Sequence, residues 1–374
     1  MGDVGCCSAK WRKLDEPAWS KCCNGIKLPA IYYHFTQKKE YLDSLKTGFT
    51  DLMLLHGLLN GMFSTDEDLH GNLPTQGTEL CAIVEAMFSL EEIISMTGDN
   101  SYADAVERIA FNTLPAQTKD DYNEQQYFQV ANQVEVKRGV LNFTLPFDKG
   151  MNNVFGCYAG YTCCTANMHQ GWTKFAAHLW YGTAKGGVAG MLYSPNTVSA
   201  TVGNNGKITF KEETNYPFGD EVLFTLSKSY PVSFPFELRV PAWCKQATVI
   251  INGKKVTSGT AGSMIAIKRL WNNGDKVILQ LPMQVTTVNG ARNSRTVERG
   301  SLIYALKIDA VLKRDSIITG SNGAYQKYFE LTPASDWNYG LSKKIIDNPA
   351  ENSEVLFKRM QQNFIWNEVN APLK

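Results

Sequence analysis

The chain has 374 residues, which suggests two or three domains at about 100–200 residues per domain. Its 37 basic and 36 acidic residues give a formal net charge of +1 without a basic block, so we expect no nucleic-acid partner. No apolar run reaches the roughly 18–20 residues that a membrane span needs, so we expect no membrane association through such a span.

The N-terminal residues lack the apolar segment of a signal peptide, which predicts a cytoplasmic location for a chain that begins at Met1. The nine cysteines include three adjacent pairs, Cys6-Cys7, Cys22-Cys23 and Cys163-Cys164. Adjacent cysteines rarely bridge each other, because such a disulfide is strained. An odd number of cysteines without regular spacing therefore favours reduced thiols or metal ligands over a disulfide framework.

The first half of the chain has the apolar spacing of helices. We predict four helical segments, over residues 26–60, 79–97, 102–114 and 166–181. Gly98 supplies a helix C-terminal signal after the second segment, and Pro115 is expected to stop the third. The polar stretch over residues 61–78 contains glycine and proline, which predicts a loop before the second segment.

After Gly186-Gly187 the sequence changes to short alternating strands separated by turn signals such as Asn252-Gly253. We predict strands over residues 207–211, 222–226, 236–240, 248–251, 263–267 and 276–281, and one more that begins at Arg299. This spacing indicates a β-sandwich. We therefore predict an α + β multidomain chain, with a helical domain over residues 1–182, a β-sandwich over 183–308 and a partial second β-rich region over 309–374.

Four side chains at two loop-to-helix junctions are candidate metal ligands. Glu79 and Cys81 enter one predicted helix, and Cys163 and Cys164 come just before another. One carboxylate and three thiols suit a tetrahedral zinc (Zn²⁺) site, and helix N-termini stabilise thiolates. Buried cysteines are common and usually inert, so spacing alone leaves a metal site and ordinary buried thiols both open.

The polar loop offers three further acids, Asp66, Glu67 and Asp68. They are either solvated loop residues, or one of them is a general acid and base beside a thiolate. His169, after the cysteine pair, either faces a ligand or packs among its aromatic neighbours. The sequence has no phosphate-binding loop, dinucleotide fingerprint or Gly-x-Ser-x-Gly elbow, which argues against kinases, dehydrogenases and serine hydrolases.

Three stretches of the sequence resemble glycoside hydrolase family 127, which groups β-L-arabinofuranosidases and their relatives. They are GMFSTDE over residues 61–67, GTELCA over 77–82 and CCTANMHQGW over 163–172. The Glu-x-Cys and Cys-Cys-x-x-Asn elements are specific when they occur together, and the resemblance runs from about Cys23 to the C-terminus. It implies an (α/α)6 barrel followed by β-sandwich domains, in agreement with the predicted order of helices and strands.

The resemblance also implies the roles of individual residues. Zinc would be bound by Glu79, Cys81, Cys163 and Cys164, and Cys163 would be the nucleophile. Glu67 matches the acid/base residue of the family, although the loop between Glu67 and Glu79 is shorter than in the characterised arabinofuranosidases. The implied activity is that of a retaining glycosidase that releases terminal β-L-arabinofuranose, or a related sugar, from a plant-type carbohydrate substrate.

A second hypothesis follows from the length of the helical region. An (α/α)6 barrel has about twelve helices of about 11–12 residues each, which with their loops exceed the roughly 180 residues before the strands. We therefore expect an N-terminally truncated barrel that exposes apolar faces. Under this hypothesis the chain is an inactive homologue, either a carbohydrate-binding protein or a structural protein that zinc stabilises.

Overall fold

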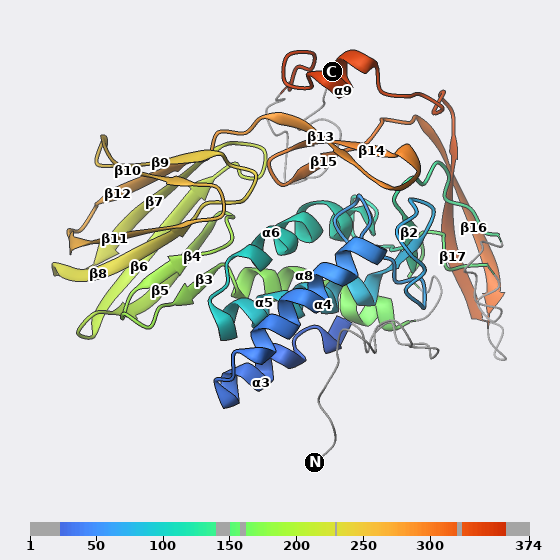
Figure 1. Cartoon of the computed structure of the whole chain (residues 1–374). Helices are drawn as coiled ribbons and strands as arrows, with labels where there is room; N and C mark the ends of the chain where they lie inside the picture. The colour runs from blue at the N-terminus through green and yellow to red at the C-terminus, as the bar shows by residue number, and fades with distance from the viewer. Residues whose placement is uncertain (1–22, 140–149, 158–161, 229, 320–323, 357–374) are drawn as a thin grey trace.

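The computed structural model of the chain describes residues 23–139, 150–157, 162–228, 230–319 and 324–356. Helices come first and most strands follow, so the protein combines α-helices with several separate β-sheets (Figure 1). This order confirms the predicted α + β class. Cys6, Cys7 and Cys22 lie outside the described residues. Within those ranges, no helix is long and apolar enough to cross a membrane.

Two helices replace the single predicted segment over residues 26–60. Helix α3 covers Leu28–Thr36 and helix α4 covers Glu40–His56, with Gln37 between them in the left-handed conformation (φ 56°). Helix α5, Leu80–Thr97, is buried along most of its length and ends at Gly98 (φ 70°). The glycine adopts this conformation at no steric cost, and the predicted helix end is confirmed.

The predicted third helix is interrupted instead of stopping at Pro115. Helix α6 covers Ser101–Arg108, a π-helical turn covers Ile109–Thr113, and the short helix α7 covers Leu114–Ala116. Proline has no N–H group to donate, and a widened π turn is one way in which a helix accommodates this loss. The expectation that Pro115 ends the helix is therefore wrong, because the chain continues in helical form through it.

Helix α8, Cys163–Ala177, begins three residues before and ends four residues before the predicted segment over 166–181. Gly171, near its middle, allows a close approach to neighbouring helices. A Cβ atom at Gly171 would lie 2.8 Å from Leu114 Cδ2 and 3.4 Å from Val84 Cγ2 on α5. The missing side chain thus lets α8 pack tightly against α5, which matters for the site described below.

The predicted β-sandwich is formed by two sheets that face each other (Figure 1). The six-stranded sheet has the order β10-β9-β12-β7-β6-β5, and the four-stranded sheet has the order β11-β8-β4-β3. Their bounds are β3 Trp180–Gly182, β4 Val188–Gly190, β5 Asn196–Val202, β6 Gly206–Thr214, β7 Glu221–Lys228, β8 Val232–Arg239, β9 Gln246–Ile251, β10 Lys254–Thr260, β11 Met264–Trp271 and β12 Lys276–Gln280. All six predicted strands are present, and β3, β4, β5 and β10 were not predicted.

Aromatic side chains fill the space between the two sheets. Phe210 of β6 stacks on Phe236 of β8 with ring centroids 4.6 Å apart, and Trp180 of β3 stacks on Phe210 at 5.5 Å. Trp180 therefore belongs to the core of the sandwich. This packing explains why the chain leaves the helical conformation before Trp180 and Tyr181, which were predicted to be helical.

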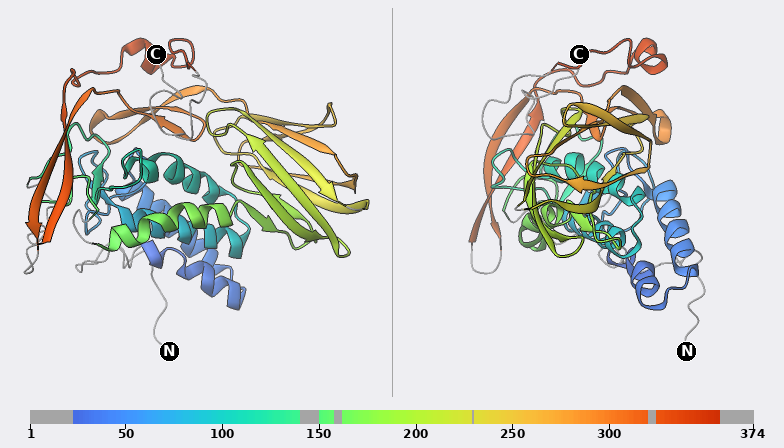
Figure 2. Two further views of the ribbon diagram at one scale, coloured as in Figure 1. Left: turned by 180° about the vertical axis from the view of Figure 1, so that it is seen from behind. Right: turned by 90° about the vertical axis from the view of Figure 1, so that its left-hand side faces the viewer.

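Smaller sheets complete the fold. Strands β13 Val285–Asn289, β14 Arg295–Arg299 and β15 Leu302–Tyr304 form one sheet, β16 Ala310–Thr319 and β17 Ala324–Pro333 form a hairpin, and β1 Gly77–Glu79 pairs with β2 Phe128–Val130. The strand predicted to begin at Arg299 is present as β15, but it begins at Leu302. Arg299 ends β14, and Gly300 (φ 61°) turns the chain between the two strands. The short helix α9 covers Lys343–Asp347. The helices lie between the sandwich and the β16–β17 hairpin, with the β13–β15 sheet alongside α6 (Figure 2).

A buried ionic network joins α6 to the sandwich. Arg239 of β8 is 1% exposed, and its guanidinium pairs with Asp104 at 2.6 Å and with Glu107. Glu107 Oε2 also accepts hydrogen bonds from the Tyr216 hydroxyl at 2.5 Å and from Ser301 Oγ at 2.9 Å. These contacts connect α6, the sandwich and the β14–β15 turn through one buried carboxylate.

Removing the arginine should therefore destabilise the whole fold. Arg239→Ala leaves the buried Glu107 carboxylate without its cation, so we expect a loss of about 3 kcal/mol in the free energy of unfolding. The exposed pair of Lys211 and Glu213, 2.7 Å apart, provides the control, because Lys211→Ala should cost less than about 1 kcal/mol. Urea denaturation measures both. Equal midpoints for the two variants would contradict a structural role for this network.

Candidate metal and active site

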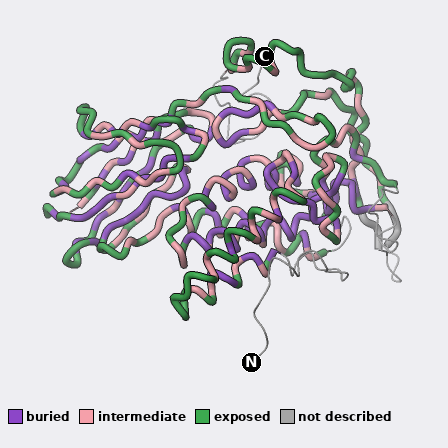
Figure 3. The backbone as a smooth tube through the Cα atoms, viewed as in Figure 1, coloured by how far each residue is buried: buried purple, intermediate pink, exposed green. Residues whose placement is uncertain are grey.

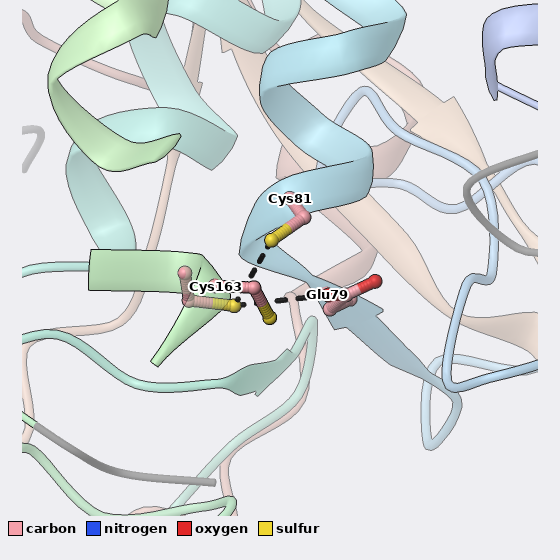
Figure 4. A group of neighbouring side chains, drawn as sticks. Glu79, Cys81 and Cys163 are labelled. Atoms are coloured by element: carbon pink, nitrogen blue, oxygen red, sulfur yellow. Dashed lines mark hydrogen bonds between the residues drawn. The ribbon is translucent and has the colours of Figure 1, made fainter. Parts of the chain in front are cut away.

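The N-termini of two helices converge on one point of the fold. Cys81 is the second residue of α5, while Cys163 and Cys164 are the first two residues of α8. Figure 4 shows Cys81, Cys163 and Glu79 gathered around one point, with Glu79 at the end of β1. The partial positive charge of each helix N-terminus stabilises a thiolate placed there. Close packing of α8 against α5 brings the two N-termini together.

The four candidate ligands form a compact cluster. One potential ligand atom from each of Glu79, Cys81, Cys163 and Cys164 lies within 4.8 Å of all the others. The Sγ atoms of Cys81 and Cys164 are 3.5 Å apart, and Cys164 Sγ donates to Glu79 Oε1 at 3.7 Å. The backbone N–H of Glu79 donates to Thr65 Oγ1 at 3.1 Å, which fixes the residue that carries the carboxylate. The structure thus brings together all four residues named from the sequence.

The cluster fits a thiophilic metal ion. Tetrahedral zinc with Zn–S bonds of 2.3 Å places neighbouring sulfur atoms about 3.8 Å apart. The Sγ atoms of Cys81 and Cys164, 3.5 Å apart, are close to that separation. Glu79 Oε2 is buried and has no hydrogen-bond partner among the described residues, which leaves a lone pair for a cation. These donors could hold a metal ion, and their chemistry suits zinc.

Negative charge in the cluster falls most easily on Cys163. Hydrogen bonds from the Cys164 and Cys81 thiols lower the pKa of Cys163 to about 3, whereas burial raises the pKa of Cys164. The pKa values of Cys163 and Cys164 shift in opposite directions because the three thiols share hydrogen bonds, so ionising one thiol opposes ionising the others. Burial also raises the pKa of Glu79 to about 9, and a bound cation would favour its anionic form. Cys163 is also the least buried of the three thiols.

Glu67 lies near this cluster in an unusual backbone conformation. Its φ is +74°, which is a strained value for a residue other than glycine and is common at functional sites. The hydroxyl of the buried Tyr127 donates to Glu67 Oε1 at 2.7 Å. Burial raises the pKa of Glu67, the Tyr127 hydrogen bond opposes this, and the nearby charge of Cys163 raises it further. A carboxyl group held protonated beside a thiolate has the properties of a general acid.

The two acids that flank Glu67 differ from each other. Asp68 is exposed, as a solvated loop residue should be. Asp66 is 1% exposed, so its interpretation as a solvated acid is wrong. Its carboxylate accepts a hydrogen bond from the Gly77 N–H at 3.0 Å and pairs with His70 Nδ1, and both contacts fold the loop that carries Glu67. Asp66 is buried because this loop needs an internal acceptor.

The remaining sequence candidate lies apart from the cluster. His169 is exposed on α8 and is absent from the group of possible metal ligands among the described residues. Sequence reasoning missed Tyr127, because its contact with Glu67 depends on the pairing of β1 with β2. It also gave no role to Asn167, whose Nδ2 donates to Cys81 Sγ at 3.2 Å. A signal for Asn167 existed, because i and i+3 positions share one face of a helix and Asn167 follows Cys164 at that spacing.

The chain is similar to β-L-arabinofuranosidases in its sequence. Residues 24–177 match the family model described as the β-L-arabinofuranosidase GH127 catalytic domain, and residues 187–283 match the GH127 middle domain. A non-reducing end β-L-arabinofuranosidase of Bifidobacterium longum subsp. longum is 26% identical over 258 residues. That alignment covers 65% of this chain and 37% of the relative.

The chain belongs to glycoside hydrolase family 127. Solved structures share the fold of this family 127 chain. A GH127 β-L-arabinofuranosidase from Geobacillus stearothermophilus T6 superposes with a TM-score of 0.65 at 21% identity, covering 87% of this chain and 55% of that one. A second GH127 β-arabinofuranosidase has a TM-score of 0.63 at 17% identity, with 84% and 57% covered. The family 127 chain thus spans little more than half the length of these structures, and about a third of the bifidobacterial enzyme.

Proposed function

We propose that this chain is a zinc-thiolate retaining glycoside hydrolase that releases terminal β-L-arabinofuranose, or a related sugar, from plant-type glycans. The observation that carries the proposal is the placement of the Cys163 thiol in a Cys3Glu cluster near the carboxyl group of Glu67. A nucleophile and a proton donor of this kind are what retaining glycoside hydrolysis requires. The bifidobacterial relative, a non-reducing end β-L-arabinofuranosidase, supports the choice of sugar.

The proposed reaction has two steps. Zinc bound by Glu79, Cys81, Cys163 and Cys164 would keep the thiols ionised at neutral pH. Cys163 Sγ attacks the anomeric carbon while Glu67 donates its proton to the leaving oxygen, so a C–S bond forms as the glycosidic C–O bond breaks. Glu67 then takes a proton from water, the water oxygen attacks the same carbon, and the C–S bond breaks. Two inversions give net retention.

We also infer that helices α3 to α8 are part of an (α/α)6-type barrel, and we keep the division of the chain at residues 182/183 and 308/309 as a proposal. The match of residues 24–177 to the GH127 catalytic domain supports a shared helical region. Strand β3, Trp180–Gly182, pairs with β4, so the last residues of the proposed helical part contact the sandwich.

An exposed apolar stripe favours the second candidate, an inactive homologue that binds carbohydrate or that zinc stabilises as a structural protein. Leu28, Tyr32 and Phe35 are spaced to share one face of α3 and are 51%, 50% and 80% exposed. Figure 3 shows exposed residues along this part of the chain. Contiguous exposed apolar side chains of this kind mark a surface that another segment or partner covers. A chain that needs such a cover could retain its metal cluster without catalysing sugar release.

One experiment separates these candidates. The purified chain is analysed for zinc under reducing, chelator-free conditions and is then assayed with an aryl β-L-arabinofuranoside. We expect one zinc ion per chain and release of the aryl group. Binding of arabinose-containing glycans without release would favour the carbohydrate-binding homologue, and zinc without either property would favour the structural protein. A chain without zinc that is also inactive would refute the proposed function.

Glu67→Gln should slow sugar release in a way that depends on the leaving group. Glutamine cannot donate a proton, so we expect kcat to fall by about 10²–10⁴-fold for a poor alkyl leaving group and much less for nitrophenol. Activity of the natural chain should fall as pH rises through the Glu67 pKa. Burial raises that pKa, so this alkaline limb should lie above the ordinary range of about 4.3. Glu67→Gln should lose the limb.

Tyr127→Phe provides the comparison. The tyrosine hydroxyl stabilises the Glu67 anion, so its removal should raise the Glu67 pKa further and move the alkaline limb of kcat/KM to higher pH. The pH profile with a poor leaving group measures this shift. If the alkaline limb of Tyr127→Phe stays unchanged or moves to lower pH, Glu67 is not the acid. Equal rate losses of Glu67→Gln for good and poor leaving groups would lead to the same conclusion.

A further inference from the structure

Asn167 makes a contact that neither metal binding nor the two-step reaction accounts for. It lies on the first turns of α8 and reaches across to α5, where its Nδ2 donates to Cys81 Sγ at 3.2 Å. Cys81 therefore receives an amide hydrogen bond from the helix that supplies the two other cysteines. Groups that donate to metal-bound sulfur orient the ligand and adjust its charge.

The orientation of the Asn167 amide is fixed by a second contact. Asn167 Oδ1 accepts a hydrogen bond from Gln170 Nε2 at 2.9 Å, one helical turn further along α8. The oxygen is engaged there, so the NH2 group must face the sulfur. The opposite orientation would place the amide oxygen against a sulfur that carries negative charge and would lose the bond to Gln170. Gln170 and Asn167 thus form a short relay that ends on Cys81.

The relay distinguishes Cys81 from Cys163. Cys81 receives a side-chain amide hydrogen bond from Asn167, whereas Cys163 receives hydrogen bonds from neighbouring thiols and from backbone N–H groups at the start of α8. A hydrogen bond to a thiolate draws electron density from the sulfur, so the Asn167 amide adjusts the charge of Cys81 as a ligand. Cys163 is also the more exposed of the two.

We propose that Asn167 is a positioning residue that orients the Cys81 sulfur as a ligand of the metal cluster. This inference rests on the proposed function, because it assigns a role to the hydrogen-bond partner of one ligand of the proposed metal cluster. The Asn167 amide and Gln170 act through Cys81 and do not touch the substrate. The Cys-Cys-x-x-Asn spacing follows from this geometry, because it places the amide one turn after the thiol pair.

Cobalt(II) is the probe that tests the inference, because cobalt–thiolate sites absorb through sulfur-to-metal charge transfer. Loss of the amide donor makes the Cys81 sulfur richer in electrons, so the charge-transfer band of Asn167→Ala should move to longer wavelength. Chelator competition should show metal affinity weakened by about 10–100-fold, the usual effect of losing a partner of a metal ligand. Asn167→Asp places an acceptor against the thiolate and should weaken binding at least as much.

Two further variants keep the test decisive. His169→Ala changes an exposed residue of the same helix outside the cluster, and it should match the natural chain in both measurements. Gln170→Ala leaves Asn167 in place but frees its oxygen, so it should shift the band in the same direction by a smaller amount. It serves as the test if Asn167→Ala fails to fold.

The outcomes separate this inference from the proposed function. A natural chain that binds no cobalt and releases no sugar refutes both. A natural chain that binds cobalt, with variants at Asn167 and Gln170 that retain its absorption band and affinity, refutes only the role of Asn167. In the active chain, we expect Asn167→Ala to lower kcat while KM stays close to the natural value, since the amide contacts a ligand and not the sugar.

Discussion

Cys163→Ser should lower glycosidase turnover by about 10⁴-fold or more, the scale of losing the nucleophile in other covalent mechanisms. A serine hydroxyl ionises far less readily than a thiol, and it cannot form the thioglycosyl bond. Hydrogen bonds from the Cys164 and Cys81 thiols, and from backbone N–H groups at the start of α8, lower the pKa of Cys163 to about 3, and the serine would lose this advantage. Packing changes little because Cys163 is only half-buried, so the fold should persist.

Cys157→Ser is the matched control for this prediction. Cys157 is an exposed free thiol outside the metal cluster, and its Sγ donates to the backbone oxygen of Asn123. We expect Cys157→Ser to retain nearly all turnover, because a hydroxyl can make the same hydrogen bond. Both variants are compared by steady-state rate and by metal content, which separates loss of the nucleophile from loss of the metal.

Mass spectrometry of the intact chain gives an independent measurement. In a Glu67→Gln background with an activated aryl glycoside, the second step should be slow, and a mass increase of one sugar should accumulate on the chain. The same background with Cys163→Ser should show no such increase. Near-normal turnover by Cys163→Ser, or a sugar attached at another residue, would exclude the thioglycosyl route.

The parts of the fold that sequence predicted correctly have strong local signals. Helix α5 combines an apolar pattern with Gly98 at its end, and strands such as β7 and β12 alternate apolar and polar residues between clear turns. The start of α8 has no such signal, because Thr162 makes no side-chain capping bond. Its end is decided by Trp180, which packs into the sandwich core. Strand β5, Asn196–Val202, has mostly polar residues and is partly buried on only one of its faces, so its apolar signal is weak.

The candidate site was predictable only in its local pieces. Glu79 with Cys81, and Cys163 with Cys164, are recognisable because each pair lies at one helix start. The two pairs come together only through the packing of α8 against α5. Gly171 permits this packing, but a glycine at this position of the sequence does not by itself predict it. The contact of Tyr127 with Glu67 and the burial of Asp66 depend on β1–β2 pairing and on loop closure. Long-range contacts of this kind leave no local pattern.

Cys81→Ala should remove the metal ion and a large part of the stability of the helical region. Cys81 is buried, and it contacts Cys164 while holding the amide of Asn167, so its loss opens the cluster on the α5 side. A metal that binds only the folded chain stabilises it by about 4.1 kcal/mol when its free concentration is 1,000 times Kd. We therefore expect the free energy of unfolding to fall by at least about 4 kcal/mol.

Cys244→Ala separates the effect of the metal from the effect of losing a buried thiol. Cys244 is fully buried and free but lies in the sandwich, outside the cluster. Its replacement should cost only the packing of one sulfur atom, about 1 kcal/mol, and should leave the metal content unchanged. The difference between the two variants in urea denaturation is then the contribution of the metal site.

Removal of the metal by a strong chelator gives a third comparison. The chelator should lower the unfolding midpoint of the natural chain and of Cys244→Ala by similar amounts, because both lose the same bound ion. It should leave Cys81→Ala unchanged, since that variant has no ion to lose. If Cys81→Ala retained one zinc per chain, or if the chelator left the natural chain unaffected, the Cys3Glu cluster would not be the metal site. Folding would then depend on the packing of α5 against α8 alone, with Cys81 and Cys164 as ordinary buried thiols.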